Sequence, residues 1–208
     1  MRTNNIGAVI KGVLENSFVA ESSYFEDVIV EKADFTKQDF SLKQFSNCKF
    51  VKVKFIDCDF SKVYFDNVLF EQCDLSNCNF DESYFQNVSF LNSKLLGASL
   101  VEANFKNSLF TDCLMQYANF YATKWTNTKI TKTNLVNSCF SYSSFSKVSL
   151  DSVDFSDSEF IDTQLADIDF STSNIDGIKI TMSSLNKMIV NSFQALSLAG
   201  FLGLKIKD

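Results

Sequence analysis

The sequence predicts an all-β solenoid, a four-sided coil of about eight turns wound around a filled interior. Two observations lead to this prediction. The first is a strict period of five. From residue 21 to residue 180 the chain divides into five-residue units without an insertion, and the last residue of every unit, its centre, is apolar. Helices repeat their apolar positions every 3.6 residues and strands every 2, so neither explains this period.

The second observation is a small residue two places before most centres, such as Ala33, Cys48 and Val53. Residues two apart in an extended segment point to the same side, so the small residue and the centre both face inward. The other three positions are largely polar and are expected to face solvent or turn a corner. Because 20 of the centres are phenylalanine, large and small layers alternate in the interior.

The asparagines indicate how many units close one turn. Five of them recur at intervals of 20 residues, always at a corner: Asn47, Asn67, Asn87, Asn107 and Asn127. Stacked asparagine side chains bond to one another along a column, which favours four units per turn. The alternative is that asparagine merely prefers corners, as Asn77 and Asn137 indicate.

Four units per turn define four sides. Side 1 carries centres 25, 45, 65 and onward, side 2 carries 30, 50, 70, side 3 carries 35, 55, 75, and side 4 carries 40, 60, 80 through 180. At about 4.8 Å per turn, the rod is about 38 Å long.

Both ends depart from this pattern. Residues 1–20 lose the period and are interpreted as an N-terminal cap, before the repeat region 21–180. In residues 181–208, Ser183 or Ser184 is expected to cap a helix that ends at Gly200, and residues 201–206 are expected to form a short strand.

The C-terminal segment is expected to cover the last turn, because an open coil edge promotes aggregation. Its apolar content also exceeds what one small end needs, so we expect it to join two copies of the chain. The candidate dimer interface is Leu185, Met188, Ile189, Phe193, Leu196, Phe201, Leu202, Leu204 and Ile206.

Composition argues against an enzyme. The chain has no histidine, no glycine-rich phosphate loop and no recognisable nucleophile motif, and no cofactor or metal is expected. No apolar run is long enough to cross a membrane, and the N-terminus lacks the apolar core of a signal peptide. Six cysteines without an export signal indicate a cytoplasmic protein with reduced thiols. A net charge of −6 disfavours nucleic acid as a direct ligand.

The cysteines and the tryptophan are interpreted mainly as interior residues. Five cysteines lie at the small inward position, and Trp125 is a centre. A disulfide between Cys58 and Cys78, one turn apart, is a weaker alternative. Cys139 is expected to face solvent.

Charge is distributed unevenly over the outward positions. Side 4 and its corners carry Asp39, Asp59, Asp81, Glu82, Glu102, Glu159 and Asp162, opposed only by Lys62 and Lys179. Along the chain, residues 113–150 hold four lysines and no acid. Residues 151–176 hold eight acids and no lysine or arginine, namely Asp151, Asp154, Asp157, Glu159, Asp162, Asp167, Asp169 and Asp176.

These thirteen acidic residues form a candidate surface that imitates DNA. Coils about 4.8 Å apart place carboxylates at spacings of the same order as the phosphates along a duplex. The alternative is a solvated surface with chance asymmetry.

The five-residue motif resembles that of the pentapeptide-repeat proteins, roughly A(D/N)LXX. The segments ADF (33–35), CDF (58–60), CDL (73–75), ANF (103–105) and VDF (153–155) match it. The resemblance covers residues 21–180 and implies a right-handed quadrilateral β-helix.

Within that superfamily, IDGIKI (175–180) and LGLKI (202–206) resemble the C-terminal end of the Qnr and mycobacterial fluoroquinolone-resistance group. This resemblance implies a homodimer joined at the C-terminus that mimics DNA and binds DNA gyrase or topoisomerase IV. It further implies inhibition of the enzyme, or its protection from quinolones or a gyrase-directed toxin. The chain lacks the loops that interrupt the coil in plasmid-borne Qnr proteins, so inhibition is easier to infer than protection.

A second hypothesis is a scaffold with an unrelated protein partner, since a fold does not determine a function. Tyr64 and Tyr84, one turn apart on side 1, are the candidate contact residues.

Overall fold

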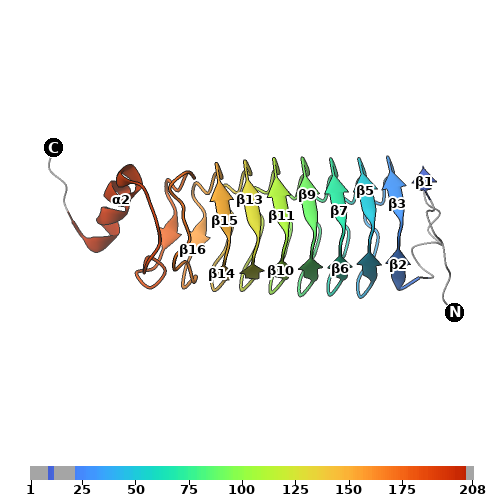
Figure 1. The fold of residues 1–208 in the computed structure, drawn as a ribbon, viewed down its shortest axis with the longest axis horizontal. Helices are drawn as coiled ribbons and strands as arrows, with labels where there is room; N and C mark the ends of the chain where they lie inside the picture. Colours follow the sequence, from blue (N-terminus) through green and yellow to red (C-terminus); the bar gives the residue numbers. More distant parts are fainter. Residues whose placement is uncertain (1–8, 12–21, 205–208) are drawn as a thin grey trace.

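The computed structural model describes residues 9–11 and 22–204, which form a rod of stacked coils with β1 at one end and α2 at the other (Figure 1). Two parallel sheets run along the rod. On side 2, eight strands follow one another: β1 (Val9–Lys11), β3 (Ile29–Glu31), β5 (Lys49–Val51), β7 (Leu69–Glu71), β9 (Ser89–Leu91), β11 (Leu109–Thr111), β13 (Lys129–Thr131) and β15 (Ser149–Asp151).

Side 1 carries the second sheet, with seven strands: β2 (Tyr24–Glu26), β4 (Gln44–Ser46), β6 (Tyr64–Asp66), β8 (Tyr84–Gln86), β10 (Asn104–Lys106), β12 (Lys124–Thr126) and β14 (Ser144–Ser146). Every paired residue lies 20 positions from its partner, as Phe45 does from Phe65. Four units therefore close each coil, as predicted, and the described chain is a quadrilateral β-solenoid.

The other two sides are held by single-residue bridges over most of the rod. Asp34 bridges to Lys54 on side 3, and Asp39 bridges to Asp59 on side 4. Near the C-terminal end, side 4 gains a strand pair, β16 (Glu159–Phe160) with β17 (Lys179–Ile180). Helix α2 (Ser192–Ala199) and the 3₁₀ helix η1 (Gly200–Leu202) follow.

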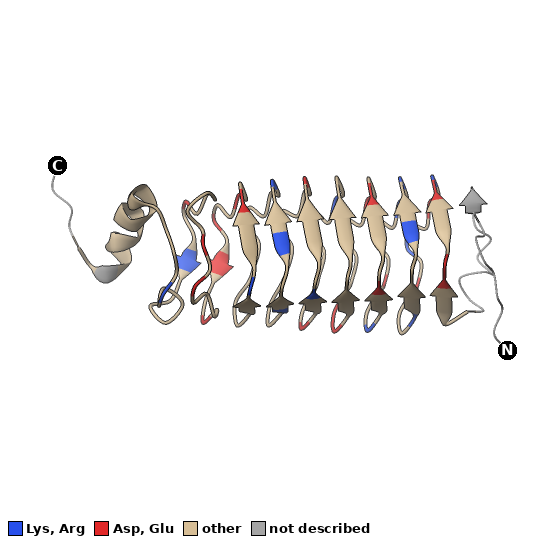
Figure 2. Cartoon of the chain, viewed as in Figure 1, with Lys and Arg blue, Asp and Glu red and all other residues tan. Residues whose placement is uncertain are grey.

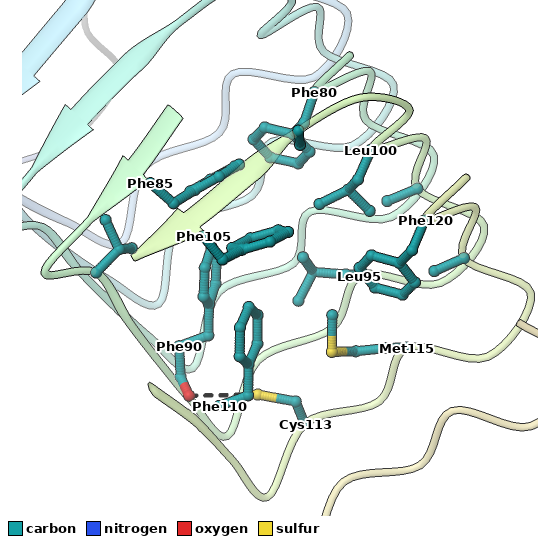
Figure 3. Close-up of a cluster of buried hydrophobic side chains, with 14 of the residues drawn as sticks. Phe80, Phe85, Phe90, Leu95, Leu100, Phe105, Phe110, Cys113, Met115 and Phe120 are labelled. Carbon is teal, nitrogen blue, oxygen red and sulfur yellow. Dashed lines mark hydrogen bonds between the residues drawn. The ribbon is translucent and has the colours of Figure 1, made fainter. Parts of the chain in front are cut away.

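The interior consists of the predicted columns of centres. Phe40 and Phe60 stack with ring centroids 4.7 Å apart and planes 5° apart, whereas Phe50 and Phe55, on neighbouring sides, meet edge to face at 5.3 Å. Figure 3 shows such columns around Phe85 and Phe105. Trp125 is buried and continues the column that contains Phe85 and Phe105, with its ring centroid 4.1 Å from that of Phe105.

Most polar residues at the small inward position bond to the neighbouring coil, although the Ser173 hydroxyl has no hydrogen-bond partner within the described chain. Ser83 Oγ donates to the Phe60 carbonyl at 2.7 Å, and the Cys113 thiol donates to the Phe90 carbonyl at 3.4 Å (Figure 3). These bonds satisfy the buried hydroxyl and thiol groups.

All six cysteines are free thiols, and five of them are buried. Cys58 and Cys78 donate to the Phe35 and Phe55 carbonyls, so the core-packing interpretation holds and the weaker disulfide alternative is not realised. Burial raises the pKa of Cys73 to about 12, which keeps that thiol protonated. Cys139 is half-buried rather than fully exposed.

The corners explain the asparagines. The second residue after a centre has a positive φ in nearly every unit, as in Asn47 (53°) and Asn107 (53°), and asparagine tolerates this conformation well. The predicted column also exists: the amide of Asn67 donates to Asn47 at 2.8 Å, and that of Asn127 donates to Asn107 at 2.8 Å. Asn87 interrupts it by donating to Asp66 instead.

At the N-terminal end, β1 lies within the expected cap and pairs with β3 at the same 20-residue spacing as the later coils. The rest of the expected cap lies outside the described residues.

At the C-terminal end the predicted helix start is wrong. The coil continues beyond residue 180: Ile189 bridges to Asp169, and its N–H donates to the Ile168 carbonyl at 3.0 Å. Ser183 and Ser184 do not cap a helix, because their hydroxyls bond to Asp162 and to the Thr163 N–H of the preceding coil. Leu185 and Met188 therefore belong to this additional coil and pack against the core.

Helix α2 begins instead after Asn191, which forms a capping box with Gln194 and leads to the expected end at Gly200. The strand expected over residues 201–206 is also wrong within the described part, where η1 is followed by a left-handed turn at Gly203. Residues 205–208 lie outside the described residues. In the described chain, no helix is long and apolar enough to cross a membrane.

Candidate protein-interaction surfaces

The acidic residues predicted on side 4 do not form one column. Successive coils place Asp39, Asp59, Asn79, Ser99, Asn119, Cys139, Glu159 and Lys179 in line along the rod. The acids therefore occupy two ends of the line, with four uncharged residues between them. A first group, which we call the N-terminal acidic group, comprises Asp39, Asp59, Asp81, Glu82 and Glu102.

Carboxylates of this group accept hydrogen bonds from nearby backbone and side-chain groups. Asp39 and Asp59 each accept the backbone N–H two residues on, from Ser41 and Ser61, at 2.8 Å. Hydrogen bonds from Ser41 lower the pKa of Asp39. Asp81 accepts from the Ser99 hydroxyl at 2.6 Å. These carboxylates are committed to hydrogen bonds that hold the corner geometry.

Lysines weaken the negative charge of side 4 at both ends. Lys62 lies 3.4 Å from Glu82, and Lys179 lies 2.7 Å from Glu159. The hydrogen bond to Glu159 raises the pKa of Lys179. Such exposed pairs contribute little to stability, but they neutralise charge locally.

The eight acids of residues 151–176 form a second group, the acidic belt. They are distributed around the rod rather than along one side: Asp151 ends β15 on side 2, Asp154 lies on side 3 and Glu159 on side 4. Six of the eight are exposed and two are half-buried. Among the described residues, only Glu159 of the belt makes an ion pair. The eight predicted residues thus lie within little more than one coil of the rod, on all of its sides.

Next to the belt lies an uncharged apolar end. Helix α2 contains no charged residue (Figure 2). Of the predicted dimer residues, five are exposed: Ile189, Phe193, Leu196, Phe201 and Leu204. The Phe193 side chain is 80% exposed, which is energetically unfavourable for so large an apolar group in water. The side chain of Leu202 and all of Ile206 lie outside what the structure describes.

Gln194 joins this end to the rod and is not among the predicted residues. Its Nε2 donates to the Phe170 and Ser173 carbonyls at 2.9 and 2.7 Å, while Asn191 Nδ2 donates to the Ser171 carbonyl at 2.8 Å. The two side chains therefore satisfy carbonyl groups at the end of the coil. The sequence signal was available, since asparagine followed by glutamine three residues later is a capping-box pattern.

Aromatic side chains form two further surfaces. Tyr64 and Tyr84 are paired on adjacent strands of side 1, and Tyr84 is exposed. They line a hollow of about 240 Å³ together with Lys106 and Lys124. Sequence reasoning missed the second surface, made by exposed tyrosines in the middle of side 4. The signal would have been aromatic residues at corner positions in a stretch without acids.

In the described residues, no cluster of histidine, cysteine, aspartate or glutamate is suited to hold a metal ion. The hollows on the surface are shallow, and the interior is filled by the stacked centres.

The chain is a quadrilateral solenoid whose interior is filled and whose distinctive groups lie on the outer surface. This architecture is that of repeat proteins built from five-residue units. The chain belongs to the pentapeptide-repeat family. The family model described as "Pentapeptide repeats (8 copies)" matches residues 31–72. A second model, described as "Pentapeptide repeat region", matches residues 63–140.

Solved structures are similar in fold. HetL, a pentapeptide-repeat protein involved in heterocyst differentiation regulation from the cyanobacterium Nostoc sp. strain PCC 7120, has a TM-score of 0.50 and 12% identity. The match covers 83% of this chain and 91% of HetL. Full-length QnrB1, a plasmid-mediated fluoroquinolone resistance protein, has a TM-score of 0.41 and 18% identity, covering 95% of this chain and 100% of QnrB1. No curated protein sequence matches the chain.

Proposed function

We propose that this protein is a non-enzymatic, DNA-mimicking rod that binds the DNA-binding surface of a type II topoisomerase, DNA gyrase or topoisomerase IV. The observation that carries the proposal is the acidic belt, eight acids with no lysine or arginine between them in residues 151–176. A surface that binds DNA is basic, and the belt offers it concentrated negative charge on a rigid scaffold.

The charge density of the belt is comparable with that of DNA. The belt occupies little more than one coil, so its eight charges lie within about 6 Å of rod length. A partner on one side meets about half of them. A duplex presents one charge per about 1.7 Å, or between three and four over the same length.

The apolar end supports an arrangement with two copies of the chain. If Phe193, Leu196 and Phe201 pack against the same residues of a second copy, two belts lie close to the joint and the rod doubles in length. Such an isologous contact covers exposed apolar surface on both chains. Binding in place of DNA inhibits the topoisomerase, and it protects the enzyme from quinolones or a toxin that act on the DNA-bound form.

The test is a gyrase supercoiling assay with and without ciprofloxacin. Asp151, Asp167, Asp169 and Asp176 are exposed, so replacing all four with asparagine removes charge without disturbing the core. We expect the concentration of this belt variant needed for inhibition to rise at least about tenfold, which corresponds to about 1.4 kcal/mol of binding. The matched control is D39N/D59N/E102Q in the N-terminal acidic group. We expect this control to change the inhibitory concentration less than about threefold. Supercoiling that is untouched by micromolar wild-type protein would contradict the proposal.

A second candidate function is a scaffold that binds an unrelated protein through side 1. The paired Tyr64 and Tyr84 and the hollow beside them favour it. Binding to such a partner is expected to depend on Y64A/Y84A and to be indifferent to the belt variant. Gyrase inhibition shows the opposite dependence under the first proposal.

A further inference from the structure

Exposed aromatic residues gather in the middle of the rod, where side 4 lacks charge. The tyrosine patch consists of Tyr117, Tyr121 and Tyr142, with Leu114 beside it on side 3. Tyr117 is 68% exposed and Tyr142 is 55% exposed. The segments that form this part of side 4 and its corners, 116–122 and 136–142, contain no charged residue. Water-exposed tyrosines mark contact surfaces, because tyrosine buries much apolar area while keeping a polar end.

Two of the tyrosines form a pair across adjacent coils. The ring centroids of Tyr121 and Tyr142 lie 5.3 Å apart, with the planes tilted by 58°. Backbone bonds fix their positions, since the Ala122 N–H donates to the Ser141 carbonyl at 2.9 Å and the Tyr142 N–H donates to the Ile161 carbonyl at 2.8 Å. The two rings therefore present aromatic faces on a rigid base, the arrangement that attracts a cationic side chain.

Acidic residues flank the patch in both directions along the rod. The corner between sides 4 and 1 carries Glu102, Ala122, Tyr142 and Asp162 on successive coils. Glu102 lies on one flank and Asp162 on the other, three coils or about 14 Å apart. Among the described residues, neither carboxylate makes an ion pair, although Asp162 accepts a hydrogen bond from Ser183. The rim is therefore negative on both sides of an aromatic centre.

A hollow opens next to Ala122, the corner residue between Glu102 and Tyr142. It has a volume of about 590 Å³, and Glu82, Glu102, Tyr84, Ala122 and Lys124 are among its lining residues. Glu82 is already paired with a lysine, whereas the Glu102 carboxylate is available to a partner. The hollow offers space for a long side chain beside Glu102 and Ala122.

The charge pattern selects the class of partner. Nucleic acid is repelled by the acids on both flanks and by the net charge of −6. A protein segment with cationic side chains complements the rim, and apolar side chains between them complement the tyrosines.

We infer that the tyrosine patch is a docking surface for a basic, amphipathic protein segment, which places an arginine or lysine against Tyr121 and Tyr142 and further basic side chains toward Glu102 and Asp162. This surface lies apart from Tyr64 and from the apolar end at helix α2 and shares only Asp162 with the acidic belt. Its role does not depend on topoisomerase binding. Cation–π contacts and desolvated tyrosines supply the affinity, while the acidic rim sets orientation and association rate.

The test uses the full-length protein with its six tyrosines labelled as 3-fluorotyrosine and observed by ¹⁹F NMR, each signal assigned with single Tyr→Phe variants. The probe is a synthetic helical peptide with three arginines on an otherwise apolar face, the outer two about 14 Å apart. We expect the peptide to shift the signals of Tyr117, Tyr121 and Tyr142. The Y121A/Y142A variant is expected to weaken binding at least about tenfold. The control variant Y64A, outside the patch and its hollow, is expected to stay within about twofold.

Three comparison ligands separate the alternatives: the same peptide with glutamate in place of arginine, a short DNA duplex, and unlabelled protein as a second copy. None of them is expected to shift the patch signals. The inference is overturned if the arginine peptide does not bind, if the glutamate peptide or the duplex binds as well, or if Tyr64 responds instead of the patch tyrosines. Patch signals that move with unlabelled protein alone would assign the patch to self-association and also overturn it. A failure of gyrase inhibition leaves these outcomes unchanged.

Discussion

Two neighbouring regions of the rod have the same backbone and opposite surfaces. Residues 113–150 and 151–176 wind through the same four sides and carry apolar centres throughout. Outside, the first region carries four lysines, three exposed tyrosines and no acid, whereas the second carries eight acids and no lysine or arginine. The inward positions specify the coil, so the outward positions are free to differ. Function in this protein is therefore encoded in residues that contribute little to the fold.

The largest expected effect tests whether the two interiors are equivalent. Phe120, in the middle region, and Phe155, in the belt region, are both fully buried. Replacing either with alanine is expected to cost about 3–5 kcal/mol of stability, because each leaves a cavity in a packed column. Urea unfolding followed by circular dichroism measures the loss. The exposed control Tyr117→Ala is expected to cost less than about 0.5 kcal/mol, and a much smaller loss at Phe155 than at Phe120 would show that the interiors differ.

The next effect tests whether the belt region depends on its C-terminal cover. Gln194→Leu leaves the Phe170 and Ser173 carbonyls without their side-chain donor, which is expected to cost about 1–3 kcal/mol. Hydrogen exchange is the measurement, and amides of residues 160–180 are expected to lose protection while those of 60–130 keep it. Equal loss along the whole rod would mean that the coils unfold as one unit rather than from the end. Leu196→Ala, on the exposed side of α2, is the control.

A smaller effect tests the ionisation of the belt. Hydrogen bonds from the Ser171 hydroxyl and N–H lower the pKa of Asp169 below its usual value of 3.8. A folded pKa below the unfolded one means that the contribution to stability is present above the unfolded value and is lost as the pH falls through the folded value. Wild type is therefore expected to melt at a higher temperature than D169N at pH 6, with the difference disappearing as the pH falls below 3.8. A difference that persists or grows in acid contradicts this account.

The smallest effect concerns the lysine that neutralises one belt residue. Lys179→Gln removes the ion pair with Glu159, which is exposed, and is expected to shift the melting temperature by no more than about 2 °C. The same substitution unmasks a carboxylate of the belt, so topoisomerase inhibition is expected to improve slightly. A supercoiling titration of the variant beside wild type checks this, and a large drop in melting temperature would assign Lys179 a structural role instead.

The sequence was most informative where its constraints were local and repeated. The five-residue period predicted the buried cysteines and the place of Trp125, and the 20-residue spacing of the asparagines predicted four units per coil. Both succeeded because every coil poses the same packing problem. The same register grouped the acids of residues 151–176. The uncharged interval of side 4 could also have been predicted from this register. The outward positions between Asp59 and Glu159 are occupied by Asn79, Ser99, Asn119 and Cys139.

Prediction failed where distant contacts override a local pattern. Leu185, Met188 and Ile189 have helical spacing, yet the preceding coil recruits Ser183, Ser184 and the Ile189 backbone into one more turn. Helix α2 therefore waits until Asn191. The Asn87 amide likewise donates to Asp66, a charged acceptor, instead of Asn67, although Asn87 still accepts from Asn107. Neither arrangement can be predicted from residue spacing alone, because both depend on side-chain and backbone contacts with the neighbouring coil.

The central claim is that the acidic belt, and not the middle of the rod, takes the place of DNA on a topoisomerase. The most direct measurement is displacement of a fluorescent DNA duplex from purified gyrase, followed by anisotropy. Wild type is expected to displace the duplex, D151N/D167N/D169N/D176N to need at least about tenfold more protein, and Y121A/Y142A to behave as wild type. Equal displacement by wild type and the belt variant, or no displacement by either, would contradict the account.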